Sequence, residues 1–214
     1  MEEVLVVARE HLFEEAAPQG FFKDPELMKK IYKHSFFKNR DEVEADESLK
    51  QIIPYCLVTN QGKIFLVKRK DTQGEARLHN KMSIGIGGHI NDKDARASIC
   101  TLLNVNTSRF SVDSKEATIL RGMQRELWEE LYIPYFNHEI LGFINDDSDA
   151  VGTVHLGILI RIEALPKDNP NITVNEPDLM SGDFADIQSI EDQYDELESW
   201  SKIALKANKE TNSG

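Results

Sequence analysis

Cysteine is scarce in this chain, and long apolar runs are missing altogether. The two cysteines, Cys56 and Cys100, lie far apart and lack the paired spacing of a zinc site, so we expect reduced thiols, with Cys56 buried, and no structural disulfide. No apolar stretch approaches the roughly 20 residues that cross a membrane. The first residues also lack the basic and apolar segments of a secretory signal, so we expect a cytoplasmic protein.

Positive charge is in short supply as well. The chain has 25 Lys and Arg against 37 Asp and Glu, a formal net charge of −12. Stable binding to a nucleic-acid backbone needs clustered Lys and Arg, so this balance argues against a nucleic-acid partner. A small anionic substrate is compatible with it, because local charge decides that contact.

Linkers and repeats are likewise absent. No internal repeat or Pro/Gly/Ser-rich stretch divides the 214 residues, and 40% apolar content is enough for one core. We therefore predict a single folded unit, with an N-terminal extension (1–50) packed on the main domain (51–207) and a disordered tail (208–214). The extension contains a predicted strand at 4–8 and a predicted amphipathic helix at 24–33.

The most informative segment that is present runs from Arg125 to Ile133. Its offsets of three and four residues place Glu126, Glu129 and Glu130 in one sector of a predicted helix, at about 100° per residue. Crowded carboxylates suit a hard cation such as Mg²⁺, whose usual biological partner is phosphate. A solvated acidic helix face is the simpler alternative for the same pattern.

The opposite face of this helix is apolar. The residues that recur there at three- and four-residue intervals predict packing against a sheet: Leu120, Met123, Leu127 and Leu131. Asp113 and Glu116 have the spacing of a capping box, which predicts a helix start near Ser114. Arg125 stands four residues before Glu129 and could fix its direction.

Strand-like runs flank the acidic helix. Residues 51–59 and 63–69 predict a hairpin around Asn60-Gln61-Gly62, residues 81–88 a short strand ending in glycines, and residues 139–144 and 153–162 a second strand pair. Apolar spacing over 190–207 predicts a closing helix. Together these elements predict a mixed sheet between helices.

The run Arg-Glu-Leu-Trp-Glu-Glu-Leu-Tyr-Ile, with Gly87-Gly88-His89-Ile90 upstream, resembles the signature of the Nudix hydrolases over roughly residues 50–207. That signature reads Gly, five residues, Glu, seven residues, Arg-Glu-apolar-x-Glu-Glu-x-Gly-apolar. Three departures stand out. Tyr132 replaces the last glycine, Ala117 lies eight before Arg125 where a glutamate is expected, and an insertion at 91–112 separates Gly88 from the helix. Such a long connection predicts a flap, a hairpin or a subunit contact.

The resemblance implies the α/β class, with a Nudix-type α/β/α sandwich, and metal-dependent hydrolysis of a diphosphate linkage. It implies Mg²⁺, with Mn²⁺ as a substitute, held by Glu126, Glu129, Glu130 and a backbone carbonyl at Gly88. We assign catalytic roles to Glu130, Glu126 and Arg125. Acids held in reserve as proton acceptors are Glu176, Asp146, Asp147 and Asp149. Candidate substrate contacts are Arg69, His89 and Lys81.

Two other functions stay open. A noncatalytic regulatory module could keep the fold and sense a nucleotide or metabolite, which the three departures favour and the intact glutamates oppose. An isomerase on the same scaffold would need a catalytic cysteine in a setting that neither Cys56 nor Cys100 reproduces. The N-terminal extension could cover the substrate site or contribute to a homodimer.

Overall fold

The computed structural model describes residues 2–69, 81–96, 114–166, 171–175, 177–178 and 180–212, and the predicted strand–helix–strand order is present in them. The strands are β1 (Glu3–Ala8), β2 (Gly20–Phe22), β3 (Phe36–Asn39), β4 (Leu49–Asn60), β5 (Lys63–Arg69), β6 (Met82–Ser83), β7 (Gly85–Gly87), β8 (Leu131–Tyr132), β9 (Tyr135–Asn145), β10 (His155–Leu165), β11 (Thr173–Val174) and β12 (Met180–Ala185). The helices are α1 (Arg9–Leu12), α2 (Leu27–His34), α3 (Arg40–Val43), α4 (Asp92–Arg96), α5 (Lys115–Glu130), α6 (Ala150–Thr153), α7 (Ile187–Glu191), a 3₁₀ turn (Tyr194–Glu196) and α8 (Ser199–Asn212).

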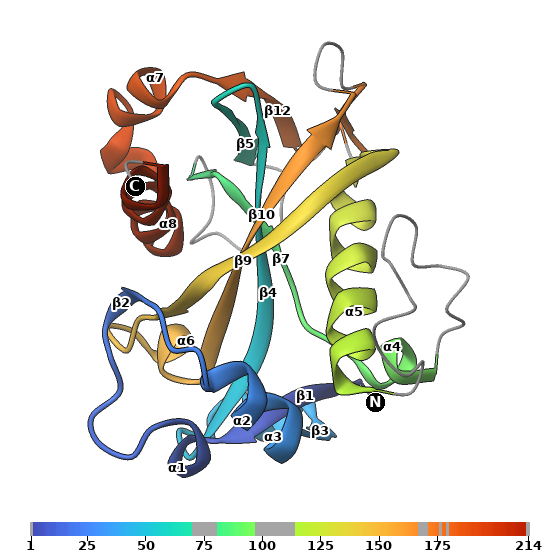
Figure 1. Ribbon diagram of the computed structural model, residues 1–214, viewed down its shortest axis with the longest axis vertical. Coiled ribbons are helices and arrows are strands. Elements are labelled where there is room, and N and C mark those ends of the chain that lie inside the picture. Colours follow the sequence, from blue (N-terminus) through green and yellow to red (C-terminus); the bar gives the residue numbers. More distant parts are fainter. Residues whose placement is uncertain are drawn as a thin grey trace.

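A mixed sheet lies between helices on its two faces. Its main strand order is β12-β5-β4-β10-β9-β2, with β4 and β10 parallel and their other neighbours antiparallel. Figure 1 shows α5 on one side of the central strands and α8 on the other. The fold is thus the predicted α/β sandwich with a mixed sheet.

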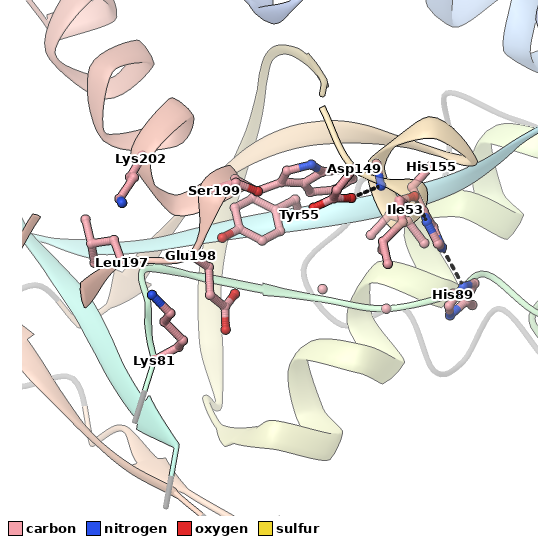
Figure 2. A pocket seen from close by; sticks show the side chains of 15 residues that line it. Ile53, Tyr55, Lys81, His89, Asp149, His155, Leu197, Glu198, Ser199 and Lys202 are labelled. Atoms are coloured by element: carbon pink, nitrogen blue, oxygen red, sulfur yellow. Dashed lines mark hydrogen bonds between the residues drawn. The ribbon is translucent and has the colours of Figure 1, made fainter. Parts of the chain in front are cut away.

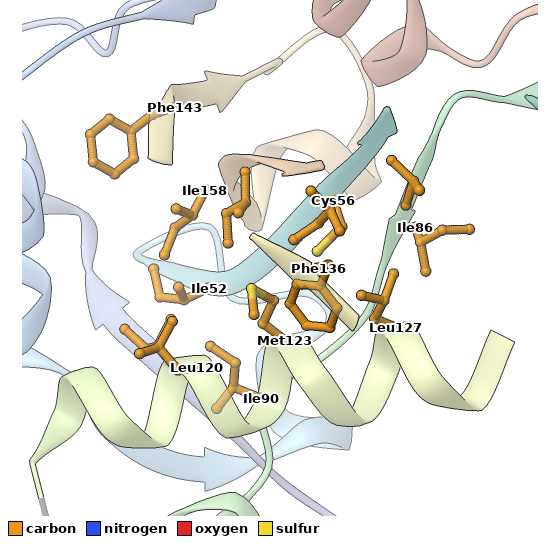
Figure 3. Packing of buried hydrophobic residues seen from close by; sticks show 14 of the residues in the cluster. Ile52, Cys56, Ile86, Ile90, Leu120, Met123, Leu127, Phe136, Phe143 and Ile158 are labelled. Carbon is orange, nitrogen blue, oxygen red and sulfur yellow. The ribbon is translucent and has the colours of Figure 1, made fainter. Parts of the chain in front are cut away.

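Strand β4 runs through the centre of the sheet and contributes to both layers of the core. Ile52, Cys56 and Val58 belong to the apolar cluster beneath α5, whereas Tyr55 and Leu57 belong to the cluster beneath α8. Side chains of a strand alternate between its faces, so one strand supports both helices. Figure 3 shows Ile52 and Cys56 packed toward Leu120, Met123 and Leu127 of α5.

The predicted hairpin is confirmed. The loop between β4 and β5 has two residues, Gln61 and Gly62, both with positive φ (47° and 80°). This is the turn geometry whose twist matches that of paired strands. The predicted strand pair β9 and β10 is also confirmed as an antiparallel ladder.

The N-terminal residues join the main sheet. Strand β1 pairs with β3 and β4, and β2 pairs with β9. Leu5 N also donates to Ile90 O (2.8 Å), so β1 holds the segment that follows Gly88.

Two predictions at the C-terminal end were wrong. The expected single helix over 190–207 is divided, because the chain turns between α7 and α8 through Tyr194–Glu196. The tail does not begin at 208, since α8 continues to Asn212 and Arg161 Nη2 donates to Thr211 Oγ1 (2.8 Å). Within the described ranges, no helix is long and apolar enough to cross a membrane.

Candidate active site

Helix α5 carries the three glutamates. It begins near Ser114, as predicted, but the N-cap is Ser114 rather than Asp113. Ser114 Oγ accepts from Ala117 N (3.1 Å), and Asp113 lies outside the described residues. The helix ends at Glu130, whose carbonyl accepts from Asn175 N (2.9 Å). The apolar stripe packs against the sheet, and the carboxylates differ in exposure: the Glu126 side chain is 17% exposed and that of Glu129 is 59% exposed.

Gly88 lies directly against Glu126. The strand β7 that precedes it is paired with β4, with Gly87 opposite Tyr55. A Cβ atom on Gly88 would be 2.1 Å from Glu126 Oε2, a contact that real structures do not tolerate. The absence of a side chain at this position lets the glycine backbone and the carboxylate meet.

Arg125 connects the pieces of the site. Its Nη2 donates to His89 O (2.7 Å), while Nε and Nη2 donate to the two oxygens of Asp94 (3.0 Å each). Its Nη1 donates to Glu126 Oε1 (2.7 Å) and, less closely, to Glu129 (3.3 Å). The predicted pairing of Arg125 with Glu129 is confirmed, but it is the most exposed of these contacts.

Asp94 is the site residue that the sequence analysis missed. It lies in α4, is 4% exposed, and also accepts from Asn91 N (2.9 Å) through Oδ2. The expected acid was sought by counting back from Arg125, which leads to the buried, apolar Ala117. In the Nudix signature, five residues separate the glycine from the first glutamate, and five residues after Gly88 the chain has Asp94. The inserted residues therefore lie between Asp94 and the helix, not between Gly88 and this acid.

Burial and neighbouring carboxylates raise the pKa of two groups at the site. Burial raises the pKa of Glu126 and, with the charges of Glu129 and Asp94, outweighs the opposing effect of Arg125. Burial also raises the pKa of the Cys56 thiol, and the negative charges of Glu126 and Glu130 add to the shift. Burial is the first cause of both pKa shifts, and the neighbouring carboxylates act in the same direction.

Tyr132 occupies the position of the missing signature glycine without backbone strain. It lies in β8, paired with Thr173 of β11, and its side chain is 50% exposed. Among the described residues other than glycine, only Gln61 has positive φ. The conformational freedom of glycine is therefore not needed at this position.

A cavity of about 600 Å³ opens beside the glycines. Figure 2 shows that its residues come from four parts of the chain. They are Ile53 and Tyr55 of β4, the glycine strand with Lys81 and His89, the segment from Asp149 to His155, and the residues from Leu197 to Lys202. Tyr55 and Trp200 form an edge-to-face pair in its wall (ring centroids 5.5 Å apart). Lys81 and His89, two predicted substrate contacts, thus line the same cavity as Gly88. The third, Arg69, ends β5, and its side chain lies outside the described set.

The reserve acids are placed differently from one another. Asp147 is bound by Lys50 Nζ (2.7 Å) and by Arg9, which occupy its carboxylate. Asp149 caps α6 by accepting from Gly152 N (2.7 Å) and lines the cavity. Glu176 lies outside the described residues. Among the described residues, no group of three or more His, Cys, Asp or Glu side chains is arranged so that it could bind a metal ion.

Comparison with known proteins places this arrangement in a family. No protein-family model matches the chain. The crystal structure of Tm1382, a proposed Nudix hydrolase, superimposes with a TM-score of 0.75 at 29% identity, covering 96% of this chain and 97% of that one. Protein YmaB of Bacillus subtilis (strain 168) is 33% identical over 215 residues, which cover 95% of this chain and 96% of YmaB.

The chain belongs to the Nudix hydrolase family. The two likenesses extend over almost the whole sequence, beyond the 50–207 range in which the resemblance was recognised. Most of the N-terminal segment is therefore shared with these two proteins, in keeping with its place in the main sheet.

Proposed function

We propose that this Nudix chain is a metal-dependent pyrophosphohydrolase that cleaves a diphosphate linkage in a nucleoside diphosphate derivative or a related small molecule. The observation that carries the proposal is the contact between Glu126 and Gly88, a residue that also lines the cavity. Gly88 thus joins the backbone next to a helix carboxylate with an open cavity, a combination that suits phosphate chemistry.

The residues present fit a hard divalent ion. Glu126, Glu129, Glu130 and the Gly88 carbonyl offer only oxygen donors, the ligand type that Mg²⁺ and Mn²⁺ prefer. The raised pKa of Glu126 supports the same assignment, because a buried carboxylate with acidic neighbours is stabilised by an added cation. When bound, the ion would neutralise charge on the phosphate oxygens and lower the pKa of a water molecule.

Side chains of the protein would supply proton transfer, substrate binding and positioning. Glu130 or Glu126 would accept the proton of the attacking water, and the cavity wall at Tyr55 and Trp200 would hold an apolar or ring-bearing part of the substrate. Lys81 and His89 would orient its phosphates. Arg125 would serve as a positioning residue, since its donors already bind Asp94, His89 O and Glu126.

Among the reserve acids, the contacts favour Asp149 over Asp147. The carboxylate of Asp147 is bound by two cations, and its pKa is lowered to about 2, so it is a poor proton acceptor. Asp149, in contrast, lines the cavity.

The decisive experiment is an activity screen with matched variants. Purified protein is incubated with Mg²⁺ or Mn²⁺ and a panel of nucleoside diphosphate derivatives, dinucleoside polyphosphates and noncanonical triphosphates, and phosphate products are measured. We expect Glu129→Gln and Glu130→Gln to lose activity by about 100-fold or more, the range for essential acid–base or metal-binding groups. Glu139→Gln is the control, because Glu139 is an exposed residue of β9 paired with Arg161.

Two outcomes would reject the proposal. Full activity in both helix variants would contradict the assigned roles. Tight ligand binding without turnover in the parent protein would instead support the noncatalytic regulatory module. A homodimeric state and a cytoplasmic location stay predictions.

A further inference from the structure

One wall of the cavity is formed by residues 146–155, the segment that leads from β9 into β10. Four of its residues line the cavity: Asp149, Val151, Gly152 and His155 (Figure 2). The segment contributes little to the apolar core, since Val154 is its only buried apolar side chain. A surface segment with so few apolar contacts depends on polar contacts for its position.

Lys50, in β4, supplies three of these polar contacts. Its side chain is fully buried, and its Nζ donates to Gly152 O (2.9 Å), to His155 O (3.1 Å) and to Asp147 Oδ1 (2.7 Å). An ammonium group has three N–H donors, so these three acceptors use all of them. All three acceptors belong to residues 146–155. The buried charge of Lys50 is therefore committed to this one wall of the cavity.

The N-terminal part of the chain holds the same segment. Arg9, in α1, donates from Nη1 to Thr153 O (3.2 Å) and from Nη2 to Asp147 Oδ2. Gln19 pairs with both the side chain and the backbone of Asp147: its Nε2 donates to Asp147 Oδ2 (2.9 Å), and its Oε1 accepts from Asp147 N (2.9 Å). The N-terminal residues thus contribute to the cavity wall through Asp147 and Thr153.

The segment is wound tightly enough to carry the position of these contacts into the cavity. A Cβ atom on Gly152 would be 1.7 Å from Asp146 O, so the two backbone stretches touch there. Gly152 N also donates to Asp149 Oδ1 (2.7 Å). At the end of the segment, His155 Nε2 lies 3.2 Å from Nε2 of His89, a predicted substrate contact. A shift of the segment would therefore move several lining residues together.

We propose that Lys50 and Arg9 are positioning residues that set the affinity of the cavity for its substrate by holding residues 146–155 in place. The inference rests on the proposed function for the nature of the substrate. Neither residue needs to touch that substrate, because each acts through the segment it holds. Removing a cation from a buried ion pair leaves its partner without compensation, so the segment moves when either cation is lost.

The effect should fall on substrate binding rather than on the chemical step. The assigned proton acceptors, Glu126 and Glu130, belong to α5, whereas the segment belongs to the connection between β9 and β10. A change that removes binding contacts common to substrate and transition state raises KM and leaves kcat unchanged. We expect KM to rise by at least about fivefold in Lys50→Met and in Arg9→Gln, with kcat within about twofold of the parent.

Hydrogen exchange tests the position of the wall without any substrate. Exchange of backbone amides is followed by mass spectrometry on the full chain, and residues 146–155 are compared with α5. In Lys50→Met and Arg9→Gln, exchange in the segment should speed up by at least about tenfold, while exchange in α5 stays within about twofold. A general loss of stability would speed up both. KM and kcat are then measured with a substrate from the activity screen.

Two further variants serve as controls. Arg161→Gln removes an arginine of similar exposure (21%, against 29% for Arg9) that donates to Thr211 Oγ1 (2.8 Å) at the end of α8. It should leave KM and the exchange of residues 146–155 as in the parent. Arg9→Lys keeps the charge and should retain most of the protection. If Lys50→Met fails to fold, the partly exposed Arg9 decides through Arg9→Gln.

Three results would overturn the inference. Exchange in residues 146–155 could match the parent in both cation variants. It could speed up equally in α5, which would show a general effect on stability. KM could stay within about twofold of the parent although the segment exchanges faster. Failure of the proposed function is a different result, because the parent would then turn over no substrate of the panel, and the exchange rates alone would decide whether Lys50 and Arg9 hold the wall.

Discussion

Arg125 holds Asp94 through two hydrogen bonds, from Nε and Nη2 to the two carboxylate oxygens, at 3.0 Å each. The two residues are 31 positions apart in the sequence, and Asp94 is almost fully buried. Through this contact α4 is fixed against α5, and the backbone between Gly88 and Asp94 is held where the helix carboxylates begin.

The first prediction concerns this contact. Asp94→Asn should lower the free energy of unfolding by about 1.5–3 kcal/mol, the range for hydrogen bonds to charged groups. It should also reduce metal-dependent activity, because Arg125 is released. Urea unfolding and the activity screen measure the two effects. Asp92→Asn is the control on the same helix: its partner Arg96 is 78% exposed, so the loss should be at most about 1 kcal/mol. Equal losses in the two variants would contradict the role given to Asp94.

The second prediction concerns Gly88. In Gly88→Ala the added methyl group would overlap Glu126 Oε2, so the carboxylate must move. We expect Mg²⁺ affinity, measured by calorimetry, and activity both to fall by at least about tenfold. Gly62→Asn is the control, because the hairpin turn has open space and Asn tolerates its positive φ of 80°. Unchanged Mg²⁺ affinity in Gly88→Ala would show that this glycine does not shape the metal site.

The third prediction is a pH dependence of stability. Burial alone would raise the pKa of Asp147, but hydrogen bonds from Lys50, Gln19 and Asn145 lower it from 3.8 to about 2. A lowered pKa gives stability that is present above pH 4 and is lost as the pH falls toward 2. Asp147→Asn should therefore destabilise the fold by roughly 2 kcal/mol at pH 7, with the difference from the parent vanishing near pH 2.

Urea unfolding at a series of pH values measures this dependence. Asp146→Asn is the neighbouring control, since the Asp146 carboxylate accepts a hydrogen bond from Ser148 N (3.2 Å) on the surface, whereas that of Asp147 accepts one from Lys50 Nζ (2.7 Å). A difference between Asp147→Asn and the parent that stays constant from pH 7 to pH 2 would rule out the electrostatic explanation.

The fourth prediction concerns Gln51, which is fully buried in β4. Neither atom of its side-chain amide has a hydrogen-bond partner among the described residues. An unsatisfied buried polar group costs about 1–3 kcal/mol, so Gln51→Met, of similar volume, should raise the free energy of unfolding by about that amount. The exposed Gln188→Met should change it by no more than about 0.5 kcal/mol. A destabilised Gln51→Met would mean that the amide has a partner in solution.

Local patterns were sufficient for the elements themselves. The hairpin turn at Gln61-Gly62 and the amphipathic helix α5 were predicted because their signals span only a few neighbouring residues. The break between α7 and α8 was missed because apolar spacing ran on through Tyr194 and Leu197, although the backbone turns there. Periodicity records which side chains are buried, not whether the helix is continuous.

By itself the sequence determined the three glutamates on one helix, the apolar stripe opposite them and the family to which they point. Only the tertiary structure decided which groups meet: Gly88 with Glu126, Arg125 with Asp94, and His89 with His155, the last pair 66 residues apart. The glycine strand and β10 both pair with β4, and that register brings distant residues to one cavity. Contacts between elements depend on how the strands pair, and the spacing of neighbouring residues in the sequence does not predict that pairing.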